Sequence, residues 1–420
     1  MIKKEKKKEL FSGYGETTNG IRKLKILYIG AVLRKEWRGG EPVVARNTIK
    51  LLEDLGYDVK QSNFELKYWK ILNRIVGIYR QFFGILDTNF FATRFYIRMI
   101  KKGSPDIIIA QYDYDTSIIK ASEKTNKKII VYSHIWWPIC PKLTLLKWTN
   151  QRCNGFLDND CTTCIVQTNI HEVNRYLVSI FKLFIRERTI KNKMKKRICY
   201  LNSKNAVVVV PSSQMKDYFI LNGVNTKQVR IIPNGITPSD FVCNITEREN
   251  IITYLGGFSE AKGYSIFLEV ARKVNILHPN VKFYATGSYK EDKKVNYINY
   301  TGYIDSLSVK ALLIKSKCTL FPAIWDEPFS LVWLESMACG TPVVTFNTGS
   351  SNEVINDGKN GILVEAFDID KMVSRLIQLL TDNQLFLNMS DSAKKTVNDF
   401  FNEKRRINML NNLILEHLSV

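Results

Sequence analysis

The chain has 420 residues, of which 45% are hydrophobic and 24% charged, and its formal net charge is +21. This composition excludes a disordered chain, and the length exceeds what one ordinary core accommodates, so we expect two domains. We find no apolar run of transmembrane length and no signal peptide, and therefore expect a soluble, cytoplasmic protein.

The positive charge is unevenly distributed. Residues 228–395 contain 17 Lys and Arg against 18 Asp and Glu, so the excess lies elsewhere, much of it in two stretches rich in bulky apolar side chains, 67–102 and 177–197. Such stretches suit an anionic membrane surface, at about 1 kcal/mol per basic side chain near the lipid. Ordinary amphipathic helices whose apolar sides face a core are an equally good interpretation. No base-reading motif accompanies the charge, so we expect no nucleic-acid partner.

The first half of the chain predicts a doubly wound sheet. It opens with an apolar strand, a glycine loop, an amphipathic helix and a second strand, which is the start of a Rossmann-like domain. Later apolar runs predict further buried strands of parallel type. The predicted elements are a strand at 24–29, a helix at 41–55, a strand beginning after Gly56, and strands at 106–110, 128–132 and 206–210.

The second half repeats this arrangement. A strand and turn at 228–235 serve as the linker, and a strand at 251–255 then leads into a second glycine loop. Further strands are predicted at 281–285, 318–321 and 342–345, and a helix at 398–418 closes the chain. The expected organisation is a basic tail (1–22), a first domain (23–215) with a cysteine-bearing loop (136–165), a second domain (228–395), and a C-terminal helix (396–420).

The most informative stretch is 326–344, which reads DEPFSLVWLESMACGTPVV. Glu327 and Glu335 lie eight positions apart on either side of a helix start predicted at about Ser330. Pro328 suits a helix start, because its missing N–H would be unpaired there anyway. A helix N-terminus offers free N–H groups and the positive end of the dipole to a phosphate. The pattern predicts a sugar-nucleotide site, with one acid for the sugar, amides for the diphosphate and one acid for the ribose.

This stretch resembles the signature of the retaining glycosyltransferases of family 4, the "group 1" family with the GT-B fold. That signature is a Glu, seven residues, a second Glu, a helix with small residues, Gly-x-Pro-Val-Val and a glycine-containing loop. Here it is met by Glu327, Glu335, the segment 340–344 and the loop 348–354. The resemblance extends from about residue 24 onward. It implies an α/β GT-B fold in which two Rossmann-like, doubly wound domains face each other across a cleft.

The resemblance implies roles for several residues of the second domain. Lys262, which precedes Gly263 after a glycine loop, matches the family's phosphate-binding lysine. Glu327 would hold the donor sugar near the positive charge that develops on it, and Glu335 would accept hydrogen bonds from the ribose hydroxyls. Charge builds up on the leaving phosphate during glycosyl transfer, so fixed donors directed at it are the main catalytic resource.

Backbone groups of the second domain complete the expected donor site. The N–H groups of Ser330, Leu331 and Val332 would bind sugar and phosphate. The family usually has an arginine where this chain has Gly257, so one positive partner for the diphosphate is missing.

The first domain would contribute to the same site from the opposite side. Gly39 and Gly40 would let the backbone approach the diphosphate. His134 follows the strand that ends at Tyr132, where the family places a histidine that touches the donor sugar. The resemblance implies that catalysis needs no metal. It also implies that the acceptor attacks on the face from which the phosphate leaves, and that this phosphate takes the proton of the acceptor.

Four of the eight cysteines fall in one predicted loop: Cys140, Cys153, Cys161 and Cys164. Thiolates at this density suit a structural zinc ion, or less often disulfides, which cytosolic proteins seldom keep. Their spacing differs from that of a standard zinc finger, so free or redox-active thiols are an equally good interpretation.

Together these features predict a retaining, metal-independent hexosyltransferase that uses a nucleotide-diphosphate sugar. Its expected acceptor is a lipid-linked glycan or polysaccharide at the inner face of the cell membrane, where the protein would be peripheral. A nucleotide-sugar epimerase or hydrolase of the same fold is one alternative. A non-catalytic module that binds sugar nucleotides is another, which the missing arginine at Gly257 favours.

Overall fold

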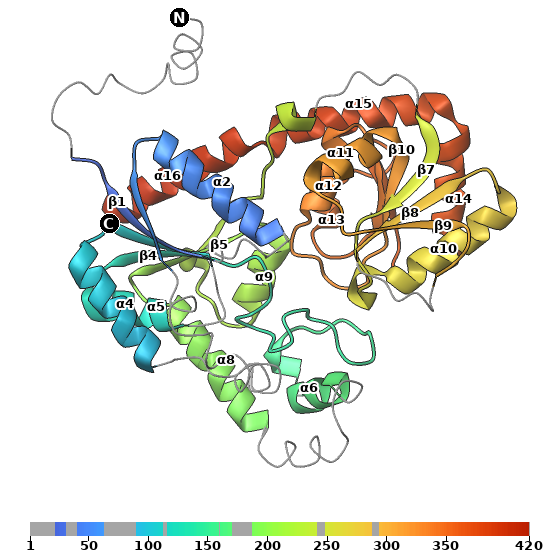
Figure 1. Cartoon of the computed structure of the whole chain (residues 1–420). Helices are drawn as coiled ribbons and strands as arrows, with labels where there is room; N and C mark the ends of the chain where they lie inside the picture. The colour runs from blue at the N-terminus through green and yellow to red at the C-terminus, as the bar shows by residue number, and fades with distance from the viewer. Residues whose placement is uncertain are drawn as a thin grey trace, which may run out of the picture.

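The protein folds into two α/β domains, as seen in a computed structural model (Figure 1). The structure describes residues 22–30, 40–62, 90–111, 116–158, 160–169, 187–241, 248–287 and 294–419. Within these residues each domain contains a six-stranded, wholly parallel sheet, which confirms the predicted fold class. The predicted basic tail lies almost entirely outside the described residues. None of the described helices is both long and apolar enough to cross a lipid bilayer.

The first sheet has the strand order β2-β1-β3-β4-β5-β6. Its strands are β1 (Lys25–Ile29), β2 (Asp58–Ser62), β3 (Ile107–Ala110), β4 (Lys128–Tyr132), β5 (Ala206–Val210) and β6 (Val229–Ile231). β6 pairs with β5, with Val208 opposite Val229. The first sheet therefore continues past the sequence-based boundary at residue 215, into the segment expected to be a linker.

Successive residues of β1 explain why this strand reads as a continuous apolar run. Leu27 and Ile29 pack into the core on one face of the sheet, whereas Ile26 and Tyr28 pack into the core on the other. Side chains alternate along a strand, so a strand covered on both faces must be apolar at every position.

Helices cover both faces of the first sheet (Figure 1). One face carries α4 (Phe90–Gly103), α5 (Ser117–Thr125), α8 (Glu187–Leu201) and α9 (Ser213–Leu221), which share one core with the sheet. The other face carries α2 (Gly40–Asp54) and the C-terminal α16 (Glu403–Ser419), which share a second core. A short helix, α6 (Cys161–Asn169), lies beside α8.

The second sheet has the strand order β12-β11-β10-β7-β8-β9. Its strands are β7 (Glu249–Tyr254), β8 (Lys282–Thr286), β9 (Ile298–Gly302), β10 (Ser316–Phe321), β11 (Val343–Phe346) and β12 (Gly361–Val364). The helices of this domain are α10 (Tyr264–Leu277), α11 (Ser306–Lys315), α12 (Leu331–Ala338), α13 (Ser351–Val354), α14 (Ile369–Thr381) and α15 (Asn383–Phe400).

The chain crosses between the domains twice, and the two crossings lie side by side. The Ile236 N–H donates to the Phe401 carbonyl over 3.0 Å, and the Glu403 N–H donates to the Ile236 carbonyl over 2.9 Å. After this point α16 packs onto the first domain, where Ile407, Leu410 and Ile414 join the core beneath β1. The C-terminal helix therefore belongs structurally to the first domain, as the resemblance implied.

Candidate active site

Glu327 lies in the loop that follows β10, and only 8% of its surface is exposed. The Trp325 indole N–H donates to its carboxylate over 3.0 Å. The Ser350 N–H donates to its carbonyl over 3.0 Å. Gly349 passes so close that a Cβ there would collide with the Glu327 backbone. The glycine-containing loop of the predicted signature thus fixes the position of Glu327.

Lys262 lies next to Glu327. It ends a single 3-10 turn (Glu260–Lys262) and is followed by Gly263, whose φ of +78° is favoured only for glycine. Its ammonium group stands 5.9 Å from the centre of the Phe321 ring. Burial raises the pKa of Glu327, and the nearby Lys262 charge and the Trp325 hydrogen bond oppose this rise. The structure therefore brings together the two residues that the sequence analysis expects to have the main roles.

The N-terminus of α12 carries the backbone groups that the sequence analysis expects to bind phosphate. The helix begins at Leu331, and Ser330 before it is extended and makes no side-chain cap. The first N–H groups of a helix have no partner within it, so those of Leu331 and Val332 remain as donors. Pro328 lies in the preceding loop and not in the first turn, because the 327–330 segment is held by the loop at 349–350.

Glu335 lies one turn further along α12. Burial raises its pKa to about 7. No described side chain pairs with its carboxyl group, which leaves both oxygens available to hydroxyl donors.

Gly257, where the family usually has arginine, occupies an open position. Its φ is +65°, and a Cβ added there would meet no atom of the described chain within 4 Å. The space for a side chain is present, whereas the backbone conformation favours glycine.

In the first domain, His134 follows β4, and the Gln111 side chain contacts one nitrogen of its ring. Its Nε2 atom lies 3.0 Å from the Gln111 side-chain nitrogen. The Tyr28 hydroxyl donates to the other end of the same amide, which fixes the amide's orientation. Because the Gln111 nitrogen can only donate, His134 Nε2 must accept, and Nδ1 carries the proton. Burial and then the Arg406 charge lower the pKa of His134 to about 4, so the ring is neutral at physiological pH.

The two sides of the site meet where α2 approaches α12. A Cβ placed on Gly40 would stand 3.2 Å from the Leu331 side chain. Gly40 therefore lies against the helix start that was predicted to bind phosphate, whereas Gly39 is outside the described residues. The N-termini of both helices face this contact (Figure 1).

Sequence reasoning gave no role to Glu41, the second residue of α2. Burial raises its pKa to about 7, and no described side chain forms an ion pair with it. Glu41 directly follows Gly39 and Gly40 in the sequence, and this position could have marked it as a candidate site residue.

Asp326 was also given no role, although it directly precedes Glu327. It is fully buried where the domains meet. Its carboxylate lies 3.6 Å from Arg152 Nε and accepts from the Tyr218 hydroxyl over 3.4 Å, and its carbonyl accepts from the Trp136 indole over 2.8 Å. All three partners belong to the first domain.

The four cysteines of the predicted loop come together. They line one cavity of about 20 Å³, together with the side chains of Lys142, Lys147 and Asp158. Among the described residues every cysteine is a free thiol, which gives no support to a disulfide. As the side chains stand, no group of three or more His, Cys, Asp or Glu in the described part of the chain is arranged to hold a metal ion. Zinc binding therefore stays a prediction.

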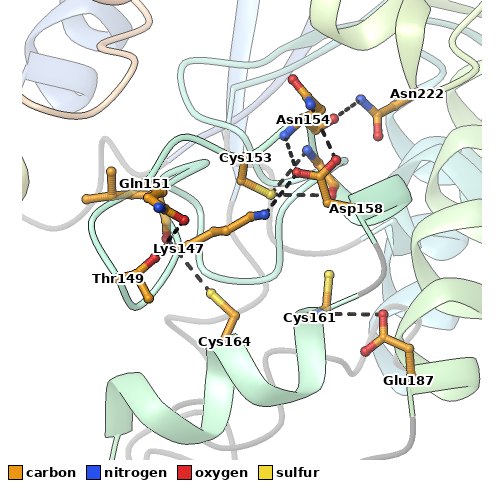
Figure 2. A network of polar contacts seen from close by, with 12 residues as sticks. Lys147, Thr149, Gln151, Cys153, Asn154, Asp158, Cys161, Cys164, Glu187 and Asn222 are labelled. Atoms are coloured by element: carbon orange, nitrogen blue, oxygen red, sulfur yellow. Dashed lines mark hydrogen bonds and ion pairs between the residues drawn. The ribbon is translucent and has the colours of Figure 1, made fainter. Parts of the chain in front are cut away.

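Polar contacts hold the cysteine loop in place (Figure 2). The Asn154 N–H donates to Asp158 over 3.0 Å, and the Asn222 side chain donates to the Asn154 carbonyl over 2.8 Å. Glu187 of α8 accepts from the Thr162 N–H over 2.9 Å and so caps the start of α6.

Comparison with known proteins places both halves of the chain. Residues 236–396 match the family model "Glycosyl transferases group 1", and residues 38–240 match "Glycosyltransferase Family 4". An uncharacterized glycosyltransferase of Methanocaldococcus jannaschii, MJ1607, is 27% identical over 224 residues, covering 47% of this chain and 57% of its own. The phosphatidyl-myo-inositol mannosyltransferase of Mycolicibacterium smegmatis is 27% identical over 167 residues, covering 37% of this chain and 43% of its own.

The chain spans about half the length of the curated relatives it matches. The solved structure of HepE from Anabaena in complex with UDP-glucose superposes on almost the whole chain. Its TM-score is 0.62 at 14% identity, with 94% of this chain and 99% of that one covered. The chain therefore belongs to the group 1 glycosyltransferases of family 4 and has their GT-B fold.

Proposed function

We propose that the protein is a retaining glycosyltransferase that moves a sugar from a nucleotide-diphosphate sugar to a lipid-linked or polysaccharide acceptor. The observation that carries the proposal is the convergence of groups from both domains. Glu327, Lys262 and the N-terminus of α12 lie opposite Gly40. His134 is connected to the start of α2 through Gln111, whose side-chain nitrogen lies 3.0 Å from His134 and 3.4 Å from the Glu41 carbonyl.

The second domain supplies what the leaving diphosphate requires. When the glycosidic bond breaks, negative charge grows on the phosphate and positive charge on the sugar ring. Lys262 and the free N–H groups of α12 are held in place before the reaction, so they stabilise the growing negative charge without reorganisation. The Glu335 carboxyl accepts hydrogen bonds from the ribose hydroxyls and places the nucleotide.

Glu327 and His134 act on the sugar. The buried Glu327 carboxylate accepts hydrogen bonds from sugar hydroxyls and stabilises the positive charge of the transition state, with little screening by water. His134, neutral and protonated on Nδ1, offers a donor to a sugar oxygen. The acceptor attacks on the face that the phosphate leaves, and the phosphate takes its proton, so that the anomeric configuration is retained and no catalytic metal is used.

The acceptor and membrane parts of the proposal are supported by charge. The apolar sides of α4 and α8 pack onto the first-domain core and are not available to lipid. Their outer sides are basic, and both helices flank α5 on one face of the domain. The exposed basic residues are Arg94, Arg98, Lys101 and Lys102 on α4 and Arg188, Lys195 and Lys196 on α8. This face suits the inner leaflet of the cell membrane, which is anionic.

The relatives support the same substrate classes. The HepE structure holds UDP-glucose, and the mycobacterial relative is named for transfer of mannose to phosphatidyl-myo-inositol, a lipid. We infer a nucleotide-diphosphate sugar as donor and a lipid-linked glycan as the favoured acceptor.

The test is hydrolysis and binding of a panel of nucleotide sugars by the purified protein, with and without a chelator. Turnover of one donor that is indifferent to the chelator, with NMR showing the anomeric configuration retained, is the expected result. Binding without turnover, even with glycolipid acceptors present, would instead favour the non-catalytic module. Conversion of the donor to an isomeric nucleotide sugar would favour an epimerase. If the leaving phosphate, and not the Glu41 carboxylate, takes the proton of the acceptor, we expect Glu41→Gln to leave the activity unchanged.

Membrane binding is tested separately by sedimentation with anionic vesicles at low and high salt. We expect binding at low salt that is weakened by Lys101→Glu/Lys102→Glu but not by Lys359→Glu, an exposed lysine of the second domain. Equal binding to neutral vesicles, or none to anionic ones, would contradict the peripheral assignment.

A further inference from the structure

We propose that Cys140, Cys153, Cys161 and Cys164 bind one Zn²⁺ ion, and that this site holds the loop at residues 136–165 against the second domain at Asp326. The proposal does not depend on the sugar donor or on turnover. It rests on the arrangement of the four thiols and on the contacts that the same loop makes with Asp326.

The four side chains already share one small space. The cavity that they line has a volume of about 20 Å³, close to the space that a single water-sized sphere needs. Cys161 and Cys164 lie three residues apart in the first turn of α6, so they project from the same side of the helix. Figure 2 shows their sulfur atoms directed from α6 towards the loop that carries Cys153.

Cys153 has the backbone setting of a thiolate ligand. The Gly155 N–H lies 3.4 Å from its sulfur and can donate to it. Hydrogen bonds to sulfur from backbone N–H groups stabilise metal-bound thiolates. Two lysines and two aspartates also line the cavity, and Lys147 lies 3.6 Å from the Asp158 carboxylate, so the lining apart from the cysteines carries no net charge.

The thiols must turn to reach zinc at about 2.3 Å. The Cys153 thiol lies 3.4 Å from the Gly155 carbonyl, and the Cys164 thiol lies 3.9 Å from the Leu146 carbonyl. Rotation between staggered side-chain conformers would redirect these sulfurs into the cavity without moving the backbone.

Buried side chains such as Trp136 and Phe156 and the polar contacts of Asn154 hold the loop, but it contains little regular secondary structure. Between β4 and α6 the described chain forms one 3-10 turn (Phe156–Asp158) and one isolated bridge, between Leu146 and Arg152. Long loops with so little secondary structure are uncommon in compact domains, and most of those that are ordered are functional. A metal that joins four points of the loop would add a further constraint to these contacts.

The same loop reaches the second domain. Leu146 packs into the core of the second sheet. Arg152, its bridge partner, lies 3.6 Å from the buried Asp326 carboxylate, and it donates to the Asn347 carbonyl over 3.4 Å. Zinc would therefore fix a clamp that ends one residue from Glu327.

Metal analysis of the purified full-length protein is the first experiment. We expect one zinc per chain, and less than a tenth of that in Cys161→Ser, whereas Cys199→Ser, which changes an exposed cysteine outside the cavity, keeps the metal. If Cys161→Ser fails to fold, cobalt titration of the metal-stripped wild type replaces it, because tetrahedral Co²⁺–thiolate sites have intense visible bands. Iron in place of zinc, or no metal together with no such cobalt bands, would overturn the zinc assignment.

Limited trypsin digestion tests the clamp itself. Lys142, Lys147 and Arg152 are the loop's own cleavage sites. We expect stripping of zinc to speed cleavage at these three sites at least tenfold, and zinc, but not Mg²⁺, to restore protection. An Arg152→Ala variant should keep its zinc yet be cleaved faster at Lys147. Equal cleavage rates with and without bound zinc would overturn the role of the metal in holding the loop.

Discussion

The two domains hold their candidate active-site residues by different means. In the second domain short backbone features place each group: Gly263 turns the chain after Lys262, the 349–350 segment grips Glu327, and α12 starts beside them. In the first domain His134 is placed by a relay of side chains that are distant in sequence. Gln111 contacts it directly, Tyr28 orients Gln111, and the charge of Arg406 in α16 reaches the ring.

This difference has a consequence for how each half responds to change. Backbone-held groups keep their positions when a neighbouring side chain is replaced, so single substitutions there should remove chemistry without removing structure. Groups held by a series of side-chain contacts shift when any member changes, and the protonation state of His134 depends on residues outside the proposed contacts with the donor. Isosteric substitutions in the second-domain site should therefore leave the melting temperature almost unchanged. Substitutions around His134 in the first domain should instead change how the rate depends on pH.

The largest expected effect is at Glu327 and Lys262. We expect Glu327→Gln and Lys262→Ala each to lower kcat by about 10²–10³, the range found when one preorganised electrostatic contact is removed. Glutamine can still accept from Trp325, so the melting temperature of Glu327→Gln should stay within about 2 °C of the wild type.

Steady-state kinetics on the donor identified by the panel, together with thermal unfolding, measures this. The matched control is Glu269→Gln, a change of the same type on α10, which should leave kcat unaltered. A loss of activity in Glu327→Gln accompanied by a large drop in melting temperature would mean that Glu327 acts in folding, and the contrast between the domains would fail.

The second expected effect concerns the His134 relay. With a pKa of about 4, His134 is neutral above pH 5, so the wild-type rate should show no histidine-dependent step between pH 6 and 8. In Gln111→Glu a carboxylate replaces the amide beside Nε2, and an adjacent opposite charge raises a histidine pKa by about 1–3 units. Histidine would then gain a proton as pH falls, so activity should decline on the acid side.

Rate profiles of wild type and Gln111→Glu from pH 5 to 8 check this, with NMR of the histidine ring as a direct measure of its pKa. Gln111→Ala is the companion variant, since it removes the hydrogen bond without adding charge. If Gln111→Ala shows the same loss of activity at low pH, the added carboxylate is not the cause, and Gln111 acts on His134 only through packing.

Most of the second-domain site could be predicted from the sequence, because its determinants are close together along the chain. Lys262 with Gly263, and Glu327 with the start of α12, are readable as short patterns. β9 was not predicted, because most of its residues are only half-buried, which leaves no apolar run to recognise.

The first-domain relay and the Asp326 contacts could not be predicted in the same way. Arg406 and Thr48 are 358 positions apart, yet the Arg406 guanidinium donates to the Thr48 hydroxyl over 2.9 Å. Asp326 carries no local pattern of its own, and its partners Trp136, Arg152 and Tyr218 come from three parts of another domain. Such pairings arise from tertiary packing. A single sequence shows each of these residues but does not show which distant residue it pairs with.

A smaller effect is expected at Glu335. Its pKa is about 7 in the folded protein against an ordinary 4.5, so it contributes stability below pH 4.5 that is lost as the pH rises through 7. Glu335→Gln cannot ionise, so its melting temperature should rise relative to the wild type between pH 5 and 8. Donor affinity behaves oppositely, because the ribose hydroxyls prefer the ionised carboxylate.

We expect wild-type donor affinity to rise from pH 6 to 8, and Glu335→Gln to bind about tenfold more weakly at pH 8, as befits a lost charge-assisted hydrogen bond. Calorimetric titration and thermal unfolding at four pH values give both quantities. A pH-independent difference in melting temperature would show that Glu335 does not titrate in this range.

The smallest expected effect is a gain, at Gly257. Arginine there has room for its side chain, and a guanidinium near the diphosphate should strengthen donor binding by about tenfold, roughly the value of one charged hydrogen bond. The backbone at φ +65° opposes this, at a stability cost of about 1–2 kcal/mol for any residue with a Cβ. Gly257→Ala has the same backbone cost without the charge, so it should lower the melting temperature as much as Gly257→Arg but leave affinity unchanged. If both variants bind the donor like the wild type, the second domain does not need the missing arginine, and its site is complete with Lys262 and the α12 amides.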